Sequence, residues 1–444
     1  MLRRIRARRT FVGSIDSWAP VLIGWAYNPD MPDHPLELAI FVDDVEIARV
    51  LASEIRADVI RAGHEVLNCG FSLDLLPHLA SASQVRVVDV ASAIEIFSSP
   101  PGLRAQLLAP RAASENLGMA SLGAEFGSDE KLALAVKASG SVALLSTFRH
   151  RQTSDLPLRH LIGAIKEQGI AVVAVDTSPD EPGETFGADK LLWRTNVGWD
   201  FASWFTALER QRAQINSAER LYLVNDSCIG PFGGLGTVLD RGWSSGSDVW
   251  SLTDSWEHGY HMQSYFMAFG ANALRSGVLT AFAEQYEYPV AKRDIVDKGE
   301  VALTRFLQAE GCSVGAVFPY ADLVTKFVNG FEDELARRMA EPQVLAVRAL
   351  DPAFIPPDVE GIIETFKMIR AGGSLNATHS FWRQLLADGF PFLKRELVVS
   401  DPAAVSDLWE VGKWIGANAT EFERVVLLAD LGRRDLLRTM IFDL

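Results

Sequence analysis

Short apolar runs recur between residues 141 and 270 at lengths typical of buried strands, and several of them end in polar side chains. The strand candidates before residue 225 are residues 142–145, 170–175, 191–193 and 220–224. Amphipathic segments at residues 158–168, just before Gly169, and at residues 201–215 separate some of these strands and read as helices. This alternation of strand and helix predicts a parallel sheet with helices on both faces.

The two flanking parts of the chain have different patterns. Residues 10–100 contain short strand-like segments, at 36–42 and 85–90, and Asp43 and Asp44 read as a tight turn. Residues 52–62 read as a short helical or irregular insert. Helical patterns dominate after about residue 321, at residues 331–339, 359–370, 381–387 and 403–440. The loop-rich segment 100–121 therefore marks a boundary between a β-rich part and an α/β part.

Composition narrows the class of protein. The chain has 444 residues, 48% of them apolar, and a net charge of -15. These values predict a globular protein of two or three domains, and the acidic charge argues against a nucleic-acid partner. Cys69, Cys228 and Cys312 are too few and too scattered for a disulfide framework, which favours a reducing compartment, the cytoplasm.

The first nine residues are rich in arginine. They read as a solvated terminus, or alternatively as a peripheral contact with anionic lipid at the inner face of the plasma membrane. No apolar signal region follows them, and no run of about 18 apolar residues occurs. We therefore expect neither a secretory signal nor a membrane-spanning segment.

Polar residues follow the third strand candidate. Asn196 and Gly198 come directly after it, and Asp200 opens the next helix. Glycine lets a backbone approach a ligand closely, so this segment is a candidate binding loop. The alternative is that Asp200 serves only as the N-cap of the helix.

A second polar group, Asn225, Asp226 and Ser227, ends the strongly apolar strand candidate at 220–224. A carboxylate at this position could hold a divalent ion that bridges a diphosphate, because hard cations prefer oxygen ligands. The same residue types, with Gly230 and Pro231 after them, also favour a turn, and taken alone the turn is the simpler interpretation.

A third strand with an acid at its end covers residues 248–254 and finishes at Asp254. Trp256, His261 and Gln263 follow as candidate pocket residues, before a further strand candidate at 266–269. His258 and His261 have the spacing His-x-x-His, but a metal site would need more carboxylate support on the same face.

Two later segments add charge to the candidate site. Glu300 opens an amphipathic helix that reaches Gly311, although an acid in a first helical turn is also favoured by the helix dipole alone. His379, Lys394 and Arg395 are cations or donors that could neutralise a leaving diphosphate. Their alternative role is in surface ion pairs, for instance with Glu396.

The order of these pieces resembles that of GT-A-type nucleotide-diphosphate-sugar transferases, with an acid at the end of the fourth strand and a later acid at a helix. Glu300 lies eleven positions before Gly311, as in inverting enzymes of this type, whereas Lys298 and Gly299 replace part of the usual acidic pair. The resemblance implies that Glu300 is the catalytic base.

A closer resemblance, over residues 142–401, is to the rhamnan synthesis protein F family. It is carried by residues 196–204, 225–227 with Gly230 and Pro231, 252–255, 261–266, 376–379 and 391–397. Residues 13–16, 24–29, 56–58, 62–63 and 70–73 are similar to a small β-module attached to some bacterial polysaccharide glycosyltransferases. Members of the family are implicated in making rhamnose-containing surface polysaccharides and O-antigens.

The resemblance implies an inverting glycosyltransferase that moves a sugar from a nucleotide-diphosphate donor, such as dTDP-rhamnose, to a polysaccharide or a lipid-linked oligosaccharide. Glu300, or alternatively Asp254, would deprotonate the acceptor hydroxyl. The implied donor-binding residues are Asn196, Gly198, Asp200, Asn225, Asp226, Ser227, His379, Lys394 and Arg395, and the implied acceptor or pocket residues are Trp256, His261 and Gln263. Asp226 is the candidate ligand of Mg²⁺ or Mn²⁺, but Asn-Asp-Ser is not Asp-x-Asp, so a metal-independent site is the alternative.

The expected fold is α/β: a GT-A-type domain at residues 141–330, with a β-rich accessory module at 1–110, a linker or helix at 111–140 and a helical region at 331–444 that completes the donor site. Two other functions remain open at this point. One is a non-catalytic carbohydrate-binding or polysaccharide-assembly protein, and the other is a metal-dependent hydrolase that uses His258 and His261.

Overall fold

The computed structural model describes residues 11–17, 21–32, 34–55, 59, 66, 68–75, 84–99, 122–149, 154–196, 198–286, 288, 294–399 and 410–431. The chain divides into two compact units, one of Met1–Gly118 with Val290–Lys292 and the other of Met119–Pro289 with Arg293–Leu444. The expectations for the arginine-rich start, for residues 100–121 and for most of the insert at 52–62 lie outside the described residues.

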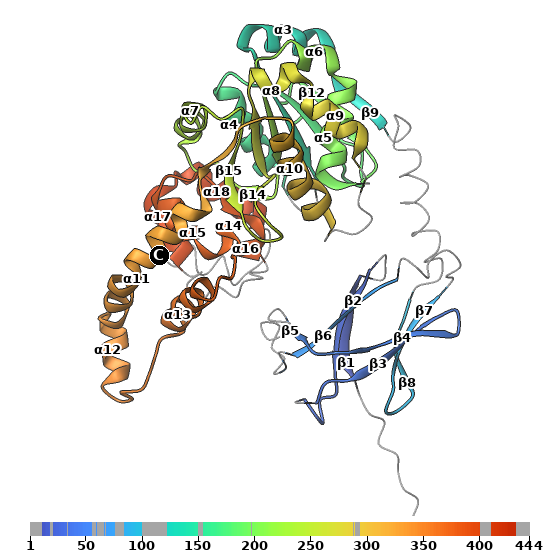
Figure 1. Cartoon of the computed structure of the whole chain (residues 1–444), viewed down its shortest axis with the longest axis vertical. Coiled ribbons are helices and arrows are strands. Elements are labelled where there is room, and N and C mark those ends of the chain that lie inside the picture. The colour runs from blue at the N-terminus through green and yellow to red at the C-terminus, as the bar shows by residue number, and fades with distance from the viewer. Residues whose placement is uncertain are drawn as a thin grey trace, which may run out of the picture. The chain divides into compact units, whose positions relative to one another are not determined.

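The first unit is built from antiparallel strands (Figure 1). One four-stranded sheet has the order β1 (Val12–Ser17), β2 (Val21–Tyr27), β6 (Asn68–Asp74), β5 (Glu54–Ile55), and the other the order β4 (Val45–Leu51), β3 (Glu37–Val42), β7 (Val85–Asp89), β8 (Ile94–Ser98). Asp43 and Asp44 have positive φ values of 46° and 68° at the β3–β4 turn, as a tight hairpin requires. The predicted β-rich region and its turn are confirmed.

The second unit contains a nine-stranded sheet within the described residues. Its order is β16 (His261–Met262), β15 (Val249–Ser255), β17 (Phe266–Phe269), β13 (Arg220–Asn225), β10 (Ser141–Thr147), β11 (Ala171–Asp176), β12 (Lys190–Arg194), β9 (Leu122–Gly127), with β18 (Val314–Phe318) beside β15. Strands β13, β10, β11 and β12 are parallel, whereas β17 and β9 run antiparallel to their neighbours. The expected parallel sheet is therefore correct for its centre, and the sheet as a whole is mixed.

Both faces of this sheet are covered, because successive residues of the central strands point to opposite sides. Ala143 and Leu145 of β10 belong to one buried cluster, and Val142 and Leu144 to another. On the first face lie α4 (Leu156–Glu167), α7 (Leu235–Ser244), α11 (Tyr320–Met339), α14 (Ala377–Ser380) and α15 (Trp382–Ala387). On the second lie α3 (Asp129–Ser139), α5 (Trp199–Arg210), α6 (Arg212–Asn216), α8 (Ala271–Ser276), α9 (Val278–Gln285) and α10 (Ala302–Ala309).

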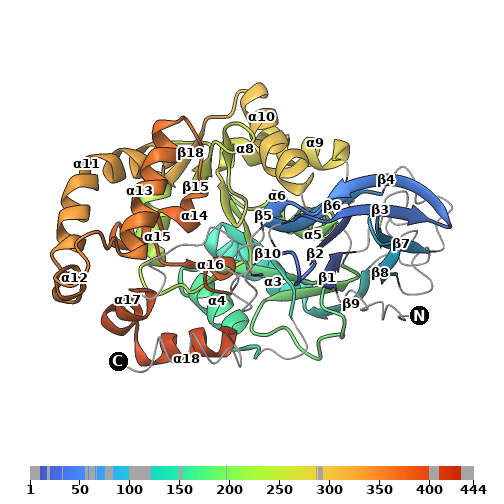
Figure 2. The ribbon, with the colours of Figure 1, turned by 90° about the horizontal axis from the view of Figure 1, so that it is seen from below.

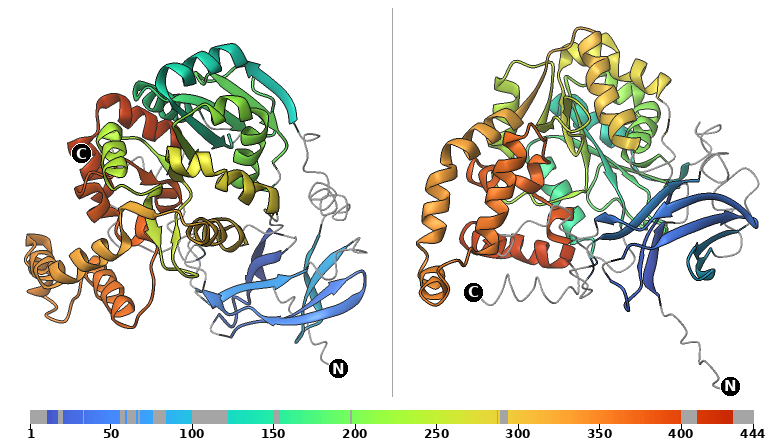
Figure 3. Two further views of the ribbon diagram at one scale, coloured as in Figure 1. Left: turned by 45° about the horizontal axis from the view of Figure 1, so that its top comes forward. Right: turned by 60° about the horizontal axis from the view of Figure 1, so that its bottom comes forward.

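The C-terminal region is mostly helical, as predicted. Helices α11 and α14 contact β15, and Figure 2 shows α14 beside that strand. Helices α11, α12 (Pro342–Arg348) and α13 (Pro357–Arg370) form a projection of the second unit that is seen again in Figure 3. A short ladder of β14 (Cys228–Ile229) and β19 (Leu393–Lys394), with α16 (Arg395–Val399), α17 (Glu410–Asn418) and α18 (Glu421–Leu431), completes the unit. None of the described helices has the length and apolar character needed to cross a bilayer.

Two predicted helices differ from the observed ones. The segment at 201–215 is divided at Gln211 into α5 and α6. Glu300 does not open a helix, because it lies inside a π-helical turn, η3 (Val296–Val301), that runs directly into α10. The helix-dipole explanation of Glu300 is therefore wrong, and π-helical turns are frequent at functional sites.

A glycine lets η3 pack closely against α5. A Cβ atom on Gly299 would lie 2.5 Å from the ring of Phe201, so the ring occupies the space that any side chain would need. We expect Gly299→Ala to lower the free energy of unfolding by about 1–3 kcal/mol, because one of the two segments must move. Urea unfolding measures this change.

Gly163 of α4 provides the matched control, because a Cβ atom there meets nothing within 4 Å. Gly163→Ala should raise stability by up to about 1 kcal/mol through helix propensity. Equal effects of the two substitutions would contradict the close packing of η3 on α5.

Candidate functional site

The carboxylate of Asp200 joins three elements of the second unit. It lies in the first turn of α5, whose N-cap is Gly198 with a φ of 75°, and it does not cap the helix. Its Oδ1 accepts a hydrogen bond from Ser146 Oγ at the end of β10, at 2.8 Å. Its Oδ2 accepts one from Asn225 Nδ2 at the end of β13, also at 2.8 Å. The N-cap alternative for Asp200 is therefore wrong.

Asp226 lies next to this group. Its Oδ2 accepts hydrogen bonds from Thr147 Oγ1 at 2.8 Å and from the backbone N–H of Phe148 at 3.0 Å. Asn225 Oδ1 accepts hydrogen bonds from the hydroxyl and the backbone N–H of Ser227, at 2.6 and 3.1 Å. The segment is thus a local turn, as its residue types indicate, and it also holds Asp226 at the carboxyl end of the central strands.

The β14–β19 ladder brings a cation to the same place. Cys228 pairs with Lys394, whose ammonium donates a hydrogen bond to Ser227 Oγ at 2.9 Å. The backbone N–H of Arg395 donates to the carbonyl oxygen of Ser227 at 3.0 Å. Two segments that are 167 residues apart in the sequence therefore place Lys394 beside the Asn-Asp-Ser turn.

His379, in the short helix α14, is 6% exposed. Its Nε2 has no hydrogen-bond partner among the described residues. Burial lowers the pKa of His379 to about 4, and the charge of Lys394 adds to this effect. The ring is therefore neutral at pH 7, with a buried polar nitrogen that a ligand could satisfy.

A second group of polar residues surrounds Glu300. Its Oε1 accepts hydrogen bonds from the hydroxyl and the backbone N–H of Ser264, at 2.6 and 2.7 Å. Its Oε2 lies 3.5 Å from His261 Nε2, while His261 Nδ1 lies 2.9 Å from the carbonyl oxygen of Gly259. Burial raises the pKa of the Glu257 carboxyl, which also interacts electrostatically with His261 and Glu300.

Asp254 is held differently from Glu300. Its Oδ1 accepts a hydrogen bond of 2.6 Å from the backbone N–H of Tyr320, the first residue of α11. The side chain is buried, and burial raises its pKa. Gln263 is also buried, and its Oε1 accepts a hydrogen bond from Thr253 Oγ1 at 2.6 Å. Both residues therefore link secondary-structure elements around the site.

Two consecutive residues, Ser264 and Tyr265, connect the two groups. Ser264 binds the Glu300 carboxylate, and the carbonyl oxygen of Tyr265 accepts a hydrogen bond from the backbone N–H of Asn225 at 3.1 Å. Lys394 Nζ lies over the Tyr265 ring, 5.1 Å from its centroid. Glu300 and the Asn225–Asp226 turn are therefore held by adjacent positions of one segment.

The remaining candidate residues are less closely tied to these groups. Asn196 is exposed. Gly198 lies against Tyr288, because a Cβ atom at Gly198 would be 2.8 Å from that ring. Trp256 is 54% exposed and packs on Tyr260, with ring centroids 5.2 Å apart.

The environment of Asp200 disfavours its charged form. Burial raises the pKa of Asp200 to about 6, and the neighbouring Asp226 charge also raises it, while the hydrogen bond from Ser146 lowers it. Burial also raises the pKa of Cys228, which fits a buried thiol and not a nucleophile. An additional cation at this place would relieve the repulsion between the two acids.

The His-x-x-His pair does not form a metal centre. His258 Nδ1 faces Asp297 Oδ1 at 3.1 Å, and His261 faces Glu300. Across the described residues, no group of three or more His, Cys, Asp or Glu side chains is arranged to hold a metal ion. A hydrolase built on these two histidines therefore has no geometric support.

Sequence reasoning did not select several residues that hold the candidate acids. These are Ser146, Thr147, Phe148, Ser264, Tyr265 and Tyr320. The available signal was that Ser146 and Thr147 are polar residues at the end of an apolar strand, as Asn225 and Asp226 are. Tyr320 acts through its backbone N–H, which no side-chain pattern reveals.

The lowered pKa of His379 predicts a pH dependence of stability. The unfolded imidazole has a pKa of about 6.5, so the stability that comes from the neutral buried ring is fully present above that pH and is lost as the pH falls toward 4. From pH 7.5 to 5.0, wild type should lose about 2 kcal/mol more unfolding free energy than His379→Asn. Urea titrations at the two pH values measure this difference.

His34→Asn is the control, because His34 is exposed in the first unit. That variant should follow the wild-type pH dependence. If His379→Asn also follows it, the buried neutral imidazole is contradicted.

Comparisons with known proteins match the part of the chain that carries several of these residues. Residues 184–344, which include Asp200, Asp226, Asp254 and Glu300, match the family model described as "Rhamnan synthesis protein F". "Virulence protein VirA" of Vibrio anguillarum is 26% identical over 235 residues, which cover 52% of this chain and 69% of that protein. "Uncharacterized protein y4gN" of Sinorhizobium fredii is 23% identical over 202 residues, 43% of this chain and 52% of that protein.

Among solved structures, the chain is similar to a mannosyltransferase from Pyrobaculum calidifontis in complex with GDP-Man and Mn²⁺. The sequence identity is 12% and the TM-score is 0.26, and the match covers 75% of this chain and 99% of that one. The α/β fold is evident from the sheet and its covering helices without this likeness. The resemblance to the rhamnan synthesis protein F family is thus confirmed over residues 184–344.

Proposed function

We propose that this protein is an inverting glycosyltransferase of the GT-A type that uses a nucleotide-diphosphate sugar. The family match supports a transferase role in polysaccharide synthesis. The proposal is carried by two hydrogen bonds of adjacent residues. Ser264 donates to the Glu300 carboxylate, and Tyr265 accepts from the backbone N–H of Asn225, which begins the Asn225–Asp226 turn. A transferase needs a base for the acceptor near a site for the diphosphate, and this segment brings one candidate of each kind together.

The proposed donor site surrounds the carboxyl ends of β10 and β13. Lys394 and His379 neutralise and hydrogen-bond the departing diphosphate, and Arg395 adds a second cation. Asn196 and Gly198 contact the nucleotide, while Asp200, Asn225 and Ser227 shape its pocket. The proposed donor is dTDP-rhamnose.

The residues present fit a divalent ion that binds together with the nucleotide. Asp226 offers one carboxylate oxygen, Oδ1, with no hydrogen bond among the described residues, and Mg²⁺ commonly takes one or two carboxylates plus phosphate oxygens. The described residues do not offer enough ligands for an ion held by the protein alone. A bound Mg²⁺ or Mn²⁺ would supply charge neutralisation of the diphosphate.

Glu300 is the better candidate for the catalytic base. Ser264 fixes Glu300 Oε1. The other oxygen, Oε2, lies 3.5 Å from His261 Nε2 and takes the proton of the acceptor hydroxyl as the hydroxyl oxygen attacks the anomeric carbon. Asp254 is already bound by the first N–H of α11 and is buried, so its carboxylate contributes to the position of that helix. Trp256, His261 and Gln263 border the acceptor pocket.

The proposed acceptor is a growing polysaccharide or a lipid-linked oligosaccharide. A lipid-linked acceptor would bring the enzyme to the cytoplasmic face of the membrane.

Replacement of the proposed base tests this reaction. Glu300→Gln should lower kcat by about 10²–10⁴-fold, because the amide keeps the hydrogen-bond acceptor for Ser264 and cannot take a proton. The affinity for dTDP should stay within about twofold of wild type. Transfer assays and calorimetry measure the two quantities.

Glu310→Gln is the control, because Glu310 is an exposed acid that follows α10. It should leave both quantities unchanged. Wild-type turnover in Glu300→Gln would remove Glu300 from the mechanism.

A second test concerns the divalent ion. Mn²⁺ alone should give no binding heat, whereas Mn²⁺ should tighten dTDP binding by about tenfold relative to EDTA. Asp226→Asn should lose this enhancement, because its amide still accepts from Thr147 and Phe148 but carries no charge. Asp240→Asn, at an exposed acid of α7, should keep it. If Mn²⁺ strengthens binding equally in Asp226→Asn, Asp226 is not the ligand.

A further inference from the structure

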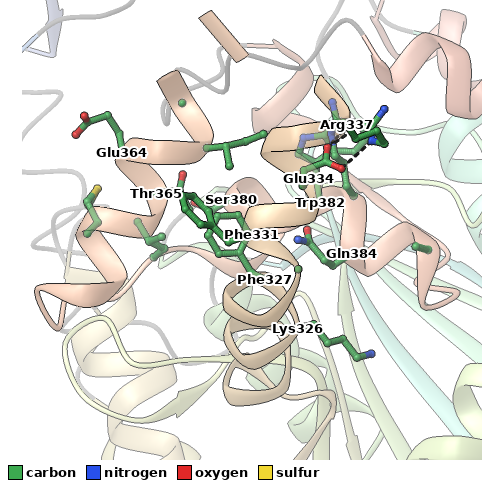
Figure 4. Close-up of a pocket in the computed structure, with 17 residues that line it drawn as sticks. Lys326, Phe327, Phe331, Glu334, Arg337, Glu364, Thr365, Ser380, Trp382 and Gln384 are labelled. Atoms are coloured by element: carbon green, nitrogen blue, oxygen red, sulfur yellow. Dashed lines mark hydrogen bonds and ion pairs between the residues drawn. The ribbon is translucent and has the colours of Figure 1, made fainter. Parts of the chain in front are cut away.

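A cavity of about 730 Å³ lies between α11, α13 and the segment around α15 (Figure 4). It is separate from the candidate site described above. Its apolar lining includes Phe327, Phe331, Ile362, Met368, Leu375 and Trp382. Cavities of about 300–1,000 Å³ with mostly apolar walls are typical ligand sites.

The charged residues at the edge of the cavity are already paired. Figure 4 shows Glu334 and Arg337 together, and Arg337 Nη2 and Nε donate hydrogen bonds to Glu334 Oε1 and Oε2 at 2.7 and 2.9 Å. Lys326 Nζ donates to Asp388 Oδ2 at 2.6 Å. These charged groups have ionic partners, and the largest lining side chains are apolar, which favours a hydrocarbon ligand.

Two elements that form the walls of the cavity also contact or contain residues of the candidate site. Helix α11 starts at Tyr320, whose N–H binds Asp254, and Lys326 follows six residues, or about 9 Å, further along the helix. On the opposite wall, Ser380 lines the cavity and is the neighbour of His379. A ligand in the cavity would thus lie close to the site without occupying it.

The apolar surface also reaches the outside of the protein. Met368, which lines the cavity, is 47% exposed. Further out, Leu345 and Leu350, on and just after α12, are 54% and 90% exposed. A cavity whose apolar lining reaches the surface at Met368 is suited to a ligand that comes from a lipid phase.

We propose that this cavity binds the hydrocarbon chain of an amphiphile, and that this amphiphile is the lipid-linked acceptor. The second half of this inference rests on the proposed transferase function. The first half, chain binding, stands on the cavity alone. The length of the chain, and not its head group, then sets the affinity.

Calorimetry with octyl, decyl and dodecyl phosphate tests chain binding in the full-length protein. Each added methylene should tighten binding by about three- to fourfold, and inorganic phosphate should not bind in the cavity. Farnesyl phosphate, compared with dodecyl phosphate, distinguishes an isoprenoid chain from a straight alkyl chain. An affinity that does not change with chain length overturns the proposal.

Gly330 offers a way to fill the cavity without disturbing the fold. It lines the cavity from α11, and a Cβ atom there meets nothing within 4 Å. Gly330→Phe should weaken dodecyl phosphate binding by at least about tenfold, and the smaller Gly330→Leu should weaken it less. Thermal unfolding should show both variants folded, since glycine is a poor helix former.

Gly163→Phe is the matched control, at a helical glycine of α4 that also has open space around its Cβ position. It should bind dodecyl phosphate as wild type does. Unchanged binding in both Gly330 variants, or an equal loss in Gly163→Phe, overturns the assignment of the cavity.

The failure of this inference can be told apart from a failure of the proposed function. Chain binding is measured without nucleotide and without turnover. Loss of chain binding in Gly330→Phe with unchanged transfer to a lipid-linked acceptor removes the cavity from the reaction. If the cavity binds chains but the protein transfers sugar to no acceptor, the cavity remains a chain-binding site. The identification of its ligand as a transferase acceptor is then wrong.

Discussion

The site depends on one partly buried, hydrogen-bonded carboxylate, that of Asp200. It accepts hydrogen bonds from the ends of β10 and β13 while it belongs to α5, so three elements share one acceptor. A buried carboxylate without donors would be costly, and the two donors come from side chains that stand where parallel strands end. The hydrogen bonds that stabilise the Asp200 carboxylate therefore also hold the polar side chains at the ends of β10 and β13 in place.

A second constraint sets the place of Glu300. The close approach of Gly299 to Phe201 brings η3 onto α5, and the hydrogen bonds from Ser264 fix the carboxylate toward the segment that also holds Asn225. The π-helical turn carries Glu300 in the middle of a helix and not at its start. Glu300, the proposed base, therefore lies on a packed helix, where a side chain is positioned more accurately than on a loop.

Much of the fold could be predicted from the chain. Runs such as residues 142–145 and 170–175 are apolar throughout, because strands at the centre of a covered sheet are buried on both faces. The direction of β17 and β9, and the division of the long helix at Gln211, could not be predicted. Strand direction depends on how connections close in space, and a local pattern does not record that.

The sequence by itself determined which residues are polar at the ends of buried strands, and so it selected Asp200, Asp226 and Asp254. Only the tertiary structure decided which of them share a neighbourhood, because Asp226 and Asp254 are held by donors 79 and 66 residues away. It also decided that Lys394 meets Ser227, through a two-residue strand pair. The physical reason is that hydrogen bonds act over about 3 Å in space, whereas a sequence pattern reports only neighbours along the chain.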